Sequence, residues 1–258
     1  MQQAESMIAY MRELKSVVVG LSGGVDSCVL AVAARKALPK EKVFAVTGDS
    51  NTLPDADRSR VAQFCAQHDI SHAFVSTYEY DNPNYRMNPE NRCFFCKEEL
   101  YRRLKEFAGS HGFSAVLDGT NVSDLKGHRP GYDALMKAEV KAPFVDLGFD
   151  KENVRNLARF WNLEMAEKPQ SACLASRIPT GTPIQLEALK SVDRAEEALR
   201  PLGFRQVRVR HHGELARLEI QMEDWNLCME KRKEIVERLR AVGFKYIALD
   251  LAGYSRGI

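Results

Sequence analysis

The first 150 residues alternate between short apolar runs and longer stretches with helical spacing. The apolar runs occupy residues 16–21, 42–48, 72–77 and 115–119, and the helical stretches occupy residues 26–38, 55–68 and 97–111. Because the apolar runs lack a strict apolar–polar alternation, they are typical of strands that are buried on both faces. Strands that alternate with helices of this length predict an α/β fold with a doubly wound parallel sheet.

The pattern changes towards the C-terminus. A helix predicted over residues 151–161 is followed by a segment punctuated by prolines, and a further helical stretch covers residues 185–203. Alternating strands follow at residues 205–213 and 214–220, then an amphipathic helix at 225–242 and a strand at 245–251. We therefore expect a first domain over residues 1–183 and a small C-terminal α+β domain over residues 184–258.

Composition agrees with a globular protein. Of the 258 residues, 45% are apolar and 28% are charged, which is sufficient for a hydrophobic core. No apolar run approaches the ~18 residues of a membrane helix, and the polar N-terminus lacks the apolar centre of a signal peptide. These features predict a cytoplasmic protein without a membrane partner. The net charge of +2 is too small to indicate binding to nucleic acid.

The loop after the first predicted strand has the composition of a phosphate-binding loop. Residues 20–27 read GLSGGVDS, so Gly23 and Gly24 stand between Ser22 and Ser27 at the start of a helix. Adjacent glycines let backbone N–H groups approach an anion, and the helix N-terminus adds a positive dipole. Asp26 would repel a bare phosphate, which points to a Mg²⁺ ion between the two. The alternative is an ordinary turn whose polar side chains cap the helix.

Residues 22–27 resemble the SGGxDS signature of the PP-loop ATP pyrophosphatases, at every fixed position. The resemblance implies that this loop binds the pyrophosphate end of ATP and that the reaction adenylates a substrate. Thr47 ends the second strand, where such enzymes contact adenosine. Asp118, Asn121 and Asp124 follow the fourth strand and are candidates for nucleotide or Mg²⁺ contacts, with a polar loop of Asx turns as the alternative.

Six cysteines are present, and three of them stand in contexts that suit chemistry. Cys93 and Cys96 form a Cys-x-x-Cys pair at the start of a predicted helix, and Cys173 lies in a loop. Such a pair brings two sulfurs to one metal or to each other, and three thiolates can hold a [4Fe–4S] cluster with one open iron. The pair alone is also compatible with a redox disulfide. The remaining cysteines, Cys28, Cys65 and Cys228, are expected to be buried.

Five segments together resemble the LarE family of ATP-dependent sulfur transferases. They read GLSGGVDS (20–27), NPENRCFFCK (88–97), DGTNVSDLKGHRPG (118–131), KPQSACLASRIPTG (168–181) and VRVRHHGELARLEI (207–220). The resemblance implies a role in assembling the nickel-pincer nucleotide cofactor. One carboxylate of pyridinium-3,5-biscarboxylic acid mononucleotide is adenylated, and sulfur then displaces AMP to give a thiocarboxylate.

The family uses two sources of sulfur. One kind of member sacrifices the sulfur of the cysteine that corresponds to Cys173 and retains dehydroalanine. The other kind holds a [4Fe–4S] cluster with three cysteines and carries an additional sulfide on it. Because this chain has Cys93 and Cys96 as well as Cys173, the resemblance favours the cluster, loaded by sulfide or another sulfur donor.

Further roles follow from the same resemblance. Ser176 and Arg177, beside Cys173, are assigned to catalysis, where Arg177 would orient a phosphate or carboxylate. Arg208 and Arg210 alternate on one strand and so share a face, which suits the substrate phosphate in a site within a homo-oligomer formed by the C-terminal domain. Glu196 and Glu219 are weaker candidates, because exposed glutamates are usually solvated.

Two other interpretations remain open at this stage. A tRNA-thiolating PP-loop enzyme also uses ATP and a cysteine trio, but it requires an RNA-binding surface. A protein that binds an iron–sulfur cluster or zinc without catalysis belongs to a different class. AMP formation with the nucleotide substrate would distinguish the enzyme from the binding protein, and AMP formation with tRNA alone would identify the thiolating enzyme.

Overall fold

A computed structural model describes residues 2–127, 129–167 and 172–254. The chain forms two compact units, of which the first comprises Met1–Tyr85 and Glu90–Ser171. The second comprises Arg86–Pro89 and Ala172–Ile258, so it begins before the boundary expected at residue 183. The start of the KPQSACLASRIPTG segment, at Lys168, lies outside the described residues.

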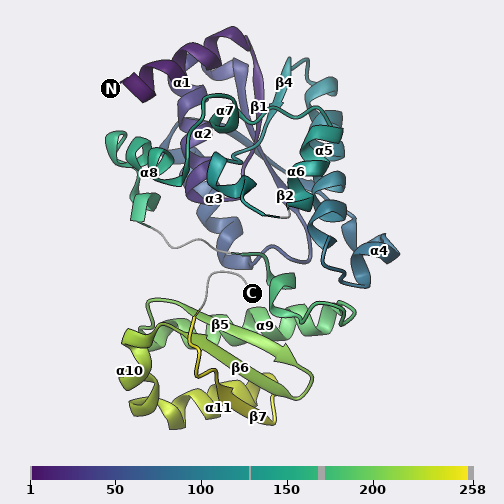
Figure 1. Ribbon diagram of the computed structural model, residues 1–258, viewed down its shortest axis with the longest axis vertical. Helices are drawn as coiled ribbons and strands as arrows, with labels where there is room; N and C mark the ends of the chain where they lie inside the picture. The colour runs from purple at the N-terminus through teal and green to yellow at the C-terminus, as the bar shows by residue number, and fades with distance from the viewer. Residues whose placement is uncertain (1, 128, 168–171, 255–258) are drawn as a thin grey trace. The chain divides into compact units, whose positions relative to one another are not determined.

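Unit 1 contains a parallel sheet in the order β3-β2-β1-β4. Its strands are β1 (Val17–Gly20), β2 (Val43–Asp49), β3 (Ser71–Ser76) and β4 (Ala115–Leu117). β1 lies in the interior, with Val17 opposite Val43 on one side and Ala115 on the other. The parallel arrangement confirms the α/β class predicted from the apolar runs (Figure 1).

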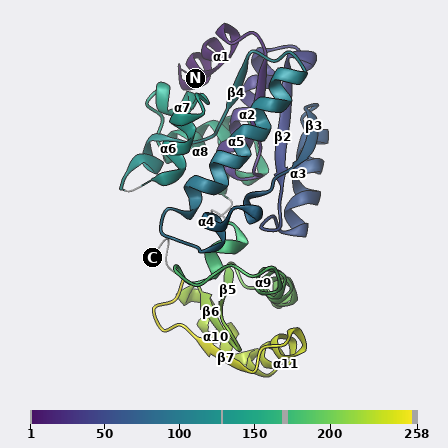
Figure 2. The same ribbon diagram turned by 90° about the vertical axis from the view of Figure 1, so that its right-hand side faces the viewer.

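Helices cover both faces of this sheet. Those before residue 171 are α1 (Gln2–Glu13), α2 (Val25–Ala37), α3 (Asp55–Gln67), α4 (Pro83–Arg86), α5 (Arg92–Ser110), α6 (Pro130–Lys137), α7 (Pro143–Asp146) and α8 (Lys151–Phe160). Val17 and Val19 face a core shared with α1, α2, α3 and α8, whereas Val18 faces a core shared with α5 and α6. Figure 2 shows α5 crossing the face of the sheet on that second side. Because successive side chains point to opposite faces, a strand between two helical layers is apolar at every position.

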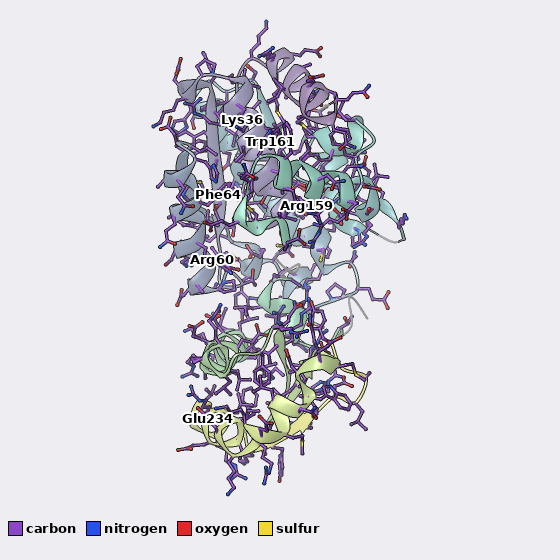
Figure 3. The ribbon with its side chains drawn as sticks, turned by 90° about the vertical axis from the view of Figure 1, so that its left-hand side faces the viewer. Lys36, Arg60, Phe64, Arg159, Trp161 and Glu234 are labelled. Atoms are coloured by element: carbon purple, nitrogen blue, oxygen red, sulfur yellow. The ribbon has the colours of Figure 1, made fainter. Side chains whose placement is uncertain are left out.

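The helices α1, α2 and α8 form one layer against the sheet, and two contacts illustrate how they pack. Met7 and Met11, four residues apart on α1, are fully buried in this core. Lys36 of α2 lies over the ring of Trp161, just after α8, with Nζ 6.0 Å from the ring centroid (Figure 3). Residues 2–13 were not predicted as a helix, although this spacing of methionines is typical of an amphipathic helix.

Unit 2 contains a smaller sheet in the order β5-β6-β7, with β5 and β6 antiparallel and β6 and β7 parallel. Its elements are α9 (Leu186–Leu199), β5 (Val207–His212), β6 (Leu215–Ile220), α10 (Trp225–Glu230), α11 (Arg232–Val242) and β7 (Tyr246–Leu249). Val209, Leu218 and Ile220 pack against the helices in one core. The single helix expected over 225–242 is two helices, because Lys231 has ψ 5° and departs from helical geometry.

Residues 86–89 join unit 2 through Asn88. Its side-chain amide donates to the carbonyl oxygens of Pro179 at 2.9 Å and Thr182 at 3.1 Å. The backbone N–H of Gly181 donates to the carbonyl of Asn88 at 2.8 Å. Asn88 is 1% exposed and has φ 53°, a conformation that asparagine tolerates better than most residues. The segment before α5 is therefore built into the segment that follows Cys173.

No helix in the described residues combines the length and the apolar character that crossing a bilayer requires.

Truncation of Met11 tests the packing of α1. Met11→Ala is expected to lower the free energy of unfolding by about 2–5 kcal/mol, because it leaves a cavity in a fully buried position. Urea unfolding followed by circular dichroism measures the change. Arg12→Ala, at the next and exposed position, is the matched control and should change stability by less than about 0.5 kcal/mol. Equal effects of the two substitutions would contradict the packing of α1.

Candidate active site

The loop between β1 and α2 is held in shape by its two serines. The backbone N–H of Ser22 donates to Oγ of Ser27 at 3.1 Å, and the two hydroxyls lie 3.1 Å apart. Ser27 also donates to the carbonyl of Gly24 at 3.1 Å. Gly24 is the N-cap residue and has no side chain, so it leaves the first N–H groups of α2 uncapped. Such a helix end suits an anion.

Gly119 places the end of β4 directly against this loop. A Cβ atom at Gly119 would lie 2.9 Å from the backbone nitrogen of Ser27 and 3.0 Å from the carbonyl carbon of Asp26. Real Cβ atoms do not approach backbone so closely. The absence of a side chain at Gly119 therefore permits the polar segment after β4 to reach the start of α2.

Asp26 is the centre of a half-buried polar network, in which Asn121 is fully buried. Its carboxylate pairs with Lys151 at the start of α8 and accepts a hydrogen bond of 3.3 Å from Asn121. Asn121 also donates to Asp124 at 2.7 Å. Burial raises the pKa of Asp26 above its usual value, and Lys151 opposes that shift while Asp124 adds to it. The structure thus brings the carboxylates of Asp26 and Asp124 together around the amide nitrogen of Asn121, and carboxylate oxygens are suitable ligands for Mg²⁺.

Asp118 lies at the end of β4, but its oxygen atoms are used within the protein. Lys97 donates to it at 2.8 Å and Tyr101 at 3.0 Å, and Thr120 donates through its backbone and its hydroxyl at 2.9 and 2.6 Å. Burial would raise the pKa of Asp118, but Lys97 and these hydrogen bonds lower it to about 2. Because Lys97 follows Cys96 directly, this ion pair fixes the N-terminal part of α5 to the sheet.

Thr47 is buried in β2, two residues before the strand ends at Asp49. Its hydroxyl donates to the carbonyl of Leu21 at 2.7 Å and lies 2.9 Å from Nε2 of His72. In the structure the side chain therefore joins β1 and β2 immediately before the phosphate-type loop, and it helps to set the position of that loop.

The six cysteines fall into two groups by exposure, and no disulfide joins any of them. Cys28, Cys65 and Cys228 are buried, and burial raises the pKa of Cys65 to about 12. Cys93 and Cys173 are exposed and Cys96 is half-buried. Cys93 and Cys96 lie near the start of α5 in unit 1, whereas Cys173 lies in unit 2. Within the described part of either unit, no three His, Cys, Asp or Glu side chains gather as a metal site.

Ser176 and Arg177 brace the backbone at Cys173. The carbonyl of Cys173 accepts hydrogen bonds from the backbone and hydroxyl of Ser176 at 3.0 and 2.8 Å, and from Arg177 at 3.3 Å. Arg177 is 4% exposed and forms a two-pronged ion pair with Glu196 at 2.8 and 3.0 Å. Burial would lower the pKa of Arg177, but the bonds to Glu196 raise it. Glu196 also accepts from the backbone of Val209 at 3.0 Å, so it connects β5 to the Cys173 segment.

Arg208 and Arg210 lie on the sheet face opposite the helices of unit 2. Arg210 pairs with Glu219 at 2.8 Å and donates to the carbonyl of Ser176. Arg208 is 8% exposed and lies 4.3 Å from the ring centroid of Tyr254, with no carboxylate among the described residues in ion-pair range. Burial, together with the charges of Arg177 and Arg210, lowers the pKa of Arg208. This face therefore holds an uncompensated positive charge that an anion would stabilise.

Sequence reasoning missed the lysines of the site. Lys97 pairs with Asp118 after β4, and Lys151 pairs with Asp26 in the first turn of α2. In the sequence, each looked like an ordinary helical lysine. The one available signal was at Lys151, the first residue of α8, where a lysine is unfavourable beside the positive end of the dipole. Lys97 lies in the second turn of α5 and gave no such signal. Glu196 was underrated because its helix appeared to be solvated.

Comparisons with known proteins cover both units. Residues 5–105 match the model of the NAD synthase family. Over 253 residues the chain is 30% identical to pyridinium-3,5-bisthiocarboxylic acid mononucleotide synthase of Lactiplantibacillus plantarum, which covers 98% of this chain and 91% of that protein. Uncharacterized proteins of Synechocystis sp. and Methanocaldococcus jannaschii are 38% and 25% identical. These matches cover 98% and 93% of this chain, and 95% and 91% of those proteins.

Gly119→Ala tests the contact between β4 and the loop. The new Cβ would displace the backbone of Asp26 and Ser27, so we expect ATP to bind at least about tenfold more weakly. Isothermal titration with ATP measures the effect. Gly109→Ala is the control, because its Cβ would meet open space on α5 and should leave binding unchanged. Unchanged ATP affinity in Gly119→Ala would show that the loop does not depend on this contact.

Lys151→Met tests the charge balance at Asp26. Removal of the ammonium raises the pKa of Asp26 further, so we expect a loss of about 1–3 kcal/mol of stability at neutral pH. When the pKa of a carboxyl group is higher in the folded than in the unfolded state, the free energy of unfolding of the protein falls as the pH rises. This loss of stability vanishes below the unfolded-state pKa. The deficit should therefore shrink as the pH falls into the acid range. Denaturant unfolding at several pH values measures it, with the exposed Lys42→Met as control, and a deficit that does not vary with pH would contradict the assignment.

Proposed function

The chain belongs to the LarE family of ATP-dependent sulfur transferases, and from this membership we propose that it converts a carboxylate of pyridinium-3,5-biscarboxylic acid mononucleotide into a thiocarboxylate. The support is 30% identity over nearly the full length of a relative named as synthase of the bisthiocarboxylic acid mononucleotide. This match includes the C-terminal part of unit 2, after residue 171, whereas the NAD synthase model ends at residue 105. The reaction is a step in the assembly of the nickel-pincer nucleotide.

The first half of the reaction is adenylation. A carboxylate oxygen of the substrate attacks the α-phosphorus of ATP, pyrophosphate leaves, and an acyl adenylate forms. The uncapped start of α2 with Ser22, Gly23, Gly24 and Ser27 would hold the departing pyrophosphate. Asp26 would face the Mg²⁺ that accompanies ATP, and the cation would relieve the cost of burying its charge. Catalysis of this half is positioning and charge stabilisation.

The second half replaces AMP by sulfur at the activated carbonyl carbon. The observation that carries this assignment is the exposure of Cys93 and Cys173 and the partial exposure of Cys96, while the chain's remaining cysteines are buried. The donor set fits a [4Fe–4S] cluster with Cys93, Cys96 and Cys173 as ligands, because thiolates are its usual ligands. Bound there, the cluster would leave one iron able to carry an extra sulfide. Ser176 and Arg177 would hold the backbone of Cys173 in place for this role.

Unit 2 would bind the phosphate of the substrate. Arg208 is buried without a carboxylate in ion-pair range among the described residues, and Arg210 extends from the same sheet face. A phosphate would supply the missing negative charge and accept hydrogen bonds from both guanidinium groups. We propose in addition that unit 2 forms a homo-oligomer, which the exposed apolar side chains of Met222, Tyr246 and Leu251 support.

The iron and sulfide contents of protein purified anaerobically test the cluster. Cys93→Ser is expected to lower both contents at least about tenfold, because a cluster does not persist on two cysteine ligands. AMP formation from ATP and the dicarboxylate mononucleotide should persist, since adenylation uses other residues. Cys65→Ala removes a buried thiol and serves as the control with unchanged iron.

Three outcomes would contradict parts of the proposal. Loss of the mass of one H₂S at Cys173 after a single turnover, with iron absent, would establish sacrificial donation in place of the cluster. AMP formation with tRNA and not with the mononucleotide would identify a tRNA-thiolating enzyme and overturn the substrate. If the protein holds a cluster but forms no AMP with either substrate, it is a cluster-binding protein without catalytic activity.

A further inference from the structure

Four arginines gather around β5 in unit 2, and only three of them have a carboxylate partner. The pairs are Arg177–Glu196 at 2.8 Å, Arg210–Glu219 at 2.8 Å and Arg217–Asp250 at 2.6 Å. Arg208 is the fourth arginine. It is 8% exposed, and no carboxylate among the described residues lies in ion-pair range of it. One positive charge of this group is therefore left without a negative partner.

The ring of Tyr254 lies against this unpaired group. The Cζ atom of Arg208 is 4.3 Å from the centroid of the ring, which is the arrangement of a cation–π contact. Such a contact uses the flat face of the guanidinium group, so the N–H groups in its plane keep their capacity to bind an anion. Tyr254 is itself partly exposed. Arg208 therefore has an aromatic partner but still lacks a negative charge.

The backbone holds Tyr254 in this place. Its N–H donates to the carbonyl oxygen of Ile220, at the end of β6, at 2.8 Å. Gly253 has φ 69°, and a Cβ atom there would lie 3.2 Å from the same carbonyl oxygen. The N–H of Gly253 donates to the carbonyl of Asp250 at 3.0 Å, which closes a turn after β7. This turn directs the chain back to the end of β6, so the ring is placed by the fold of unit 2.

The hydroxyl of Tyr254 has a proton without an acceptor. Nε2 of Gln206 donates to the hydroxyl oxygen at 2.7 Å, so this oxygen already acts as an acceptor. A phenol has a single proton to donate, and within the described part of the chain that proton has no acceptor in hydrogen-bond range. The missing partner of Tyr254 is therefore a group that accepts a hydrogen bond.

Electrostatics place this hydroxyl beside the unpaired arginine. Burial lowers the pKa of Arg208, and the oxygen of Tyr254 opposes that shift. Burial would also lower the pKa of Arg177, but Glu196 raises it and Tyr254 adds to the rise. The oxygen of Tyr254 is thus within electrostatic range of both guanidinium groups. An acceptor for its proton would stand next to Arg208, where a negative charge is missing.

We propose that Tyr254 is a third hydrogen-bond donor to the phosphate of the substrate, beside Arg208 and Arg210. The inference rests on the proposed function, because it adds a residue to the phosphate site of unit 2. A phosphate monoester has three terminal oxygens, so it can accept from two guanidinium groups and one phenol at once. Its negative charge also supplies what Arg208 lacks. The hydroxyl of Tyr254 contributes to affinity only for ligands that carry the phosphate.

Tyr254→Phe removes the hydroxyl and keeps the ring beside Arg208. We expect inorganic phosphate to bind at least about tenfold more weakly, because one hydrogen bond to a charged group is lost. Chemical-shift titration of the full chain measures this affinity at the amides of β5 and β6, so that phosphate bound in unit 1 is not counted. Tyr78→Phe, at an exposed position of unit 1, is the matched control and should change the affinity by less than about twofold.

The dicarboxylate mononucleotide and its dephosphorylated nucleoside separate this role from a structural one. In Tyr254→Phe the KM of the mononucleotide for AMP formation should rise at least about tenfold, while kcat and the affinity for the nucleoside stay within about twofold of the parent chain. Equal losses for the two compounds would mean that the hydroxyl only supports the fold, and they would overturn the proposal. Unchanged affinity for inorganic phosphate would do the same.

Arg208→Met distinguishes failure of this inference from failure of the phosphate site itself. The substitution replaces an uncompensated, largely buried charge by an apolar side chain, so unit 2 should remain folded. Loss of phosphate binding in Arg208→Met without any change in Tyr254→Phe would overturn the role of Tyr254 alone. Phosphate binding that survives Arg208→Met would overturn the phosphate site of unit 2 together with this inference.

Discussion

The half-buried charge of Asp26 is the constraint on which the nucleotide end of unit 1 depends. The carboxylate lies in the first turn of α2, and its compensation comes from Asn121 after β4 and from Lys151 at the start of α8. Three segments that are distant in sequence must therefore meet at one point. Gly119 makes the meeting possible, because any side chain there would collide with the backbone of α2. The loop that the family uses for ATP is thus built as much from the segment after β4 as from its own glycines.

The α/β fold and the family could be predicted because both depend on local patterns. The apolar runs identified each strand of the parallel sheet, since burial on two faces leaves little room for polar residues. The family resemblance is confirmed by the relative that matches along nearly the whole chain. Residues 2–13 and the break at Lys231 were missed for different reasons. The helix α1 has only a narrow apolar stripe, and the break depends on one backbone torsion at an ordinary lysine.

For the site, residue types could be predicted but their partners could not. Asp26, Asn121 and Asp124 were expected near the nucleotide and do lie together. Asp118, by contrast, is occupied by Lys97, Tyr101 and Thr120, and Arg177 is occupied by Glu196. These pairings join residues far apart in the chain, and no spacing rule indicates them. Ser176 and Arg177 consequently hold the Cys173 backbone, which is a positioning role that their proximity in sequence did not reveal.

The inclusion of residues 86–89 in unit 2 has a consequence for how the chain is made. During synthesis, Asn88 leaves the ribosome long before Pro179 and Thr182, the residues whose carbonyls it binds. Unit 2 cannot fold completely until its C-terminal part has been translated. Until then, residues 86–89, which interrupt the chain of unit 1, lack the carbonyl groups of Pro179 and Thr182 that bind Asn88. The two units are therefore not separable by a single cut, and their order of folding is tied to the order of translation.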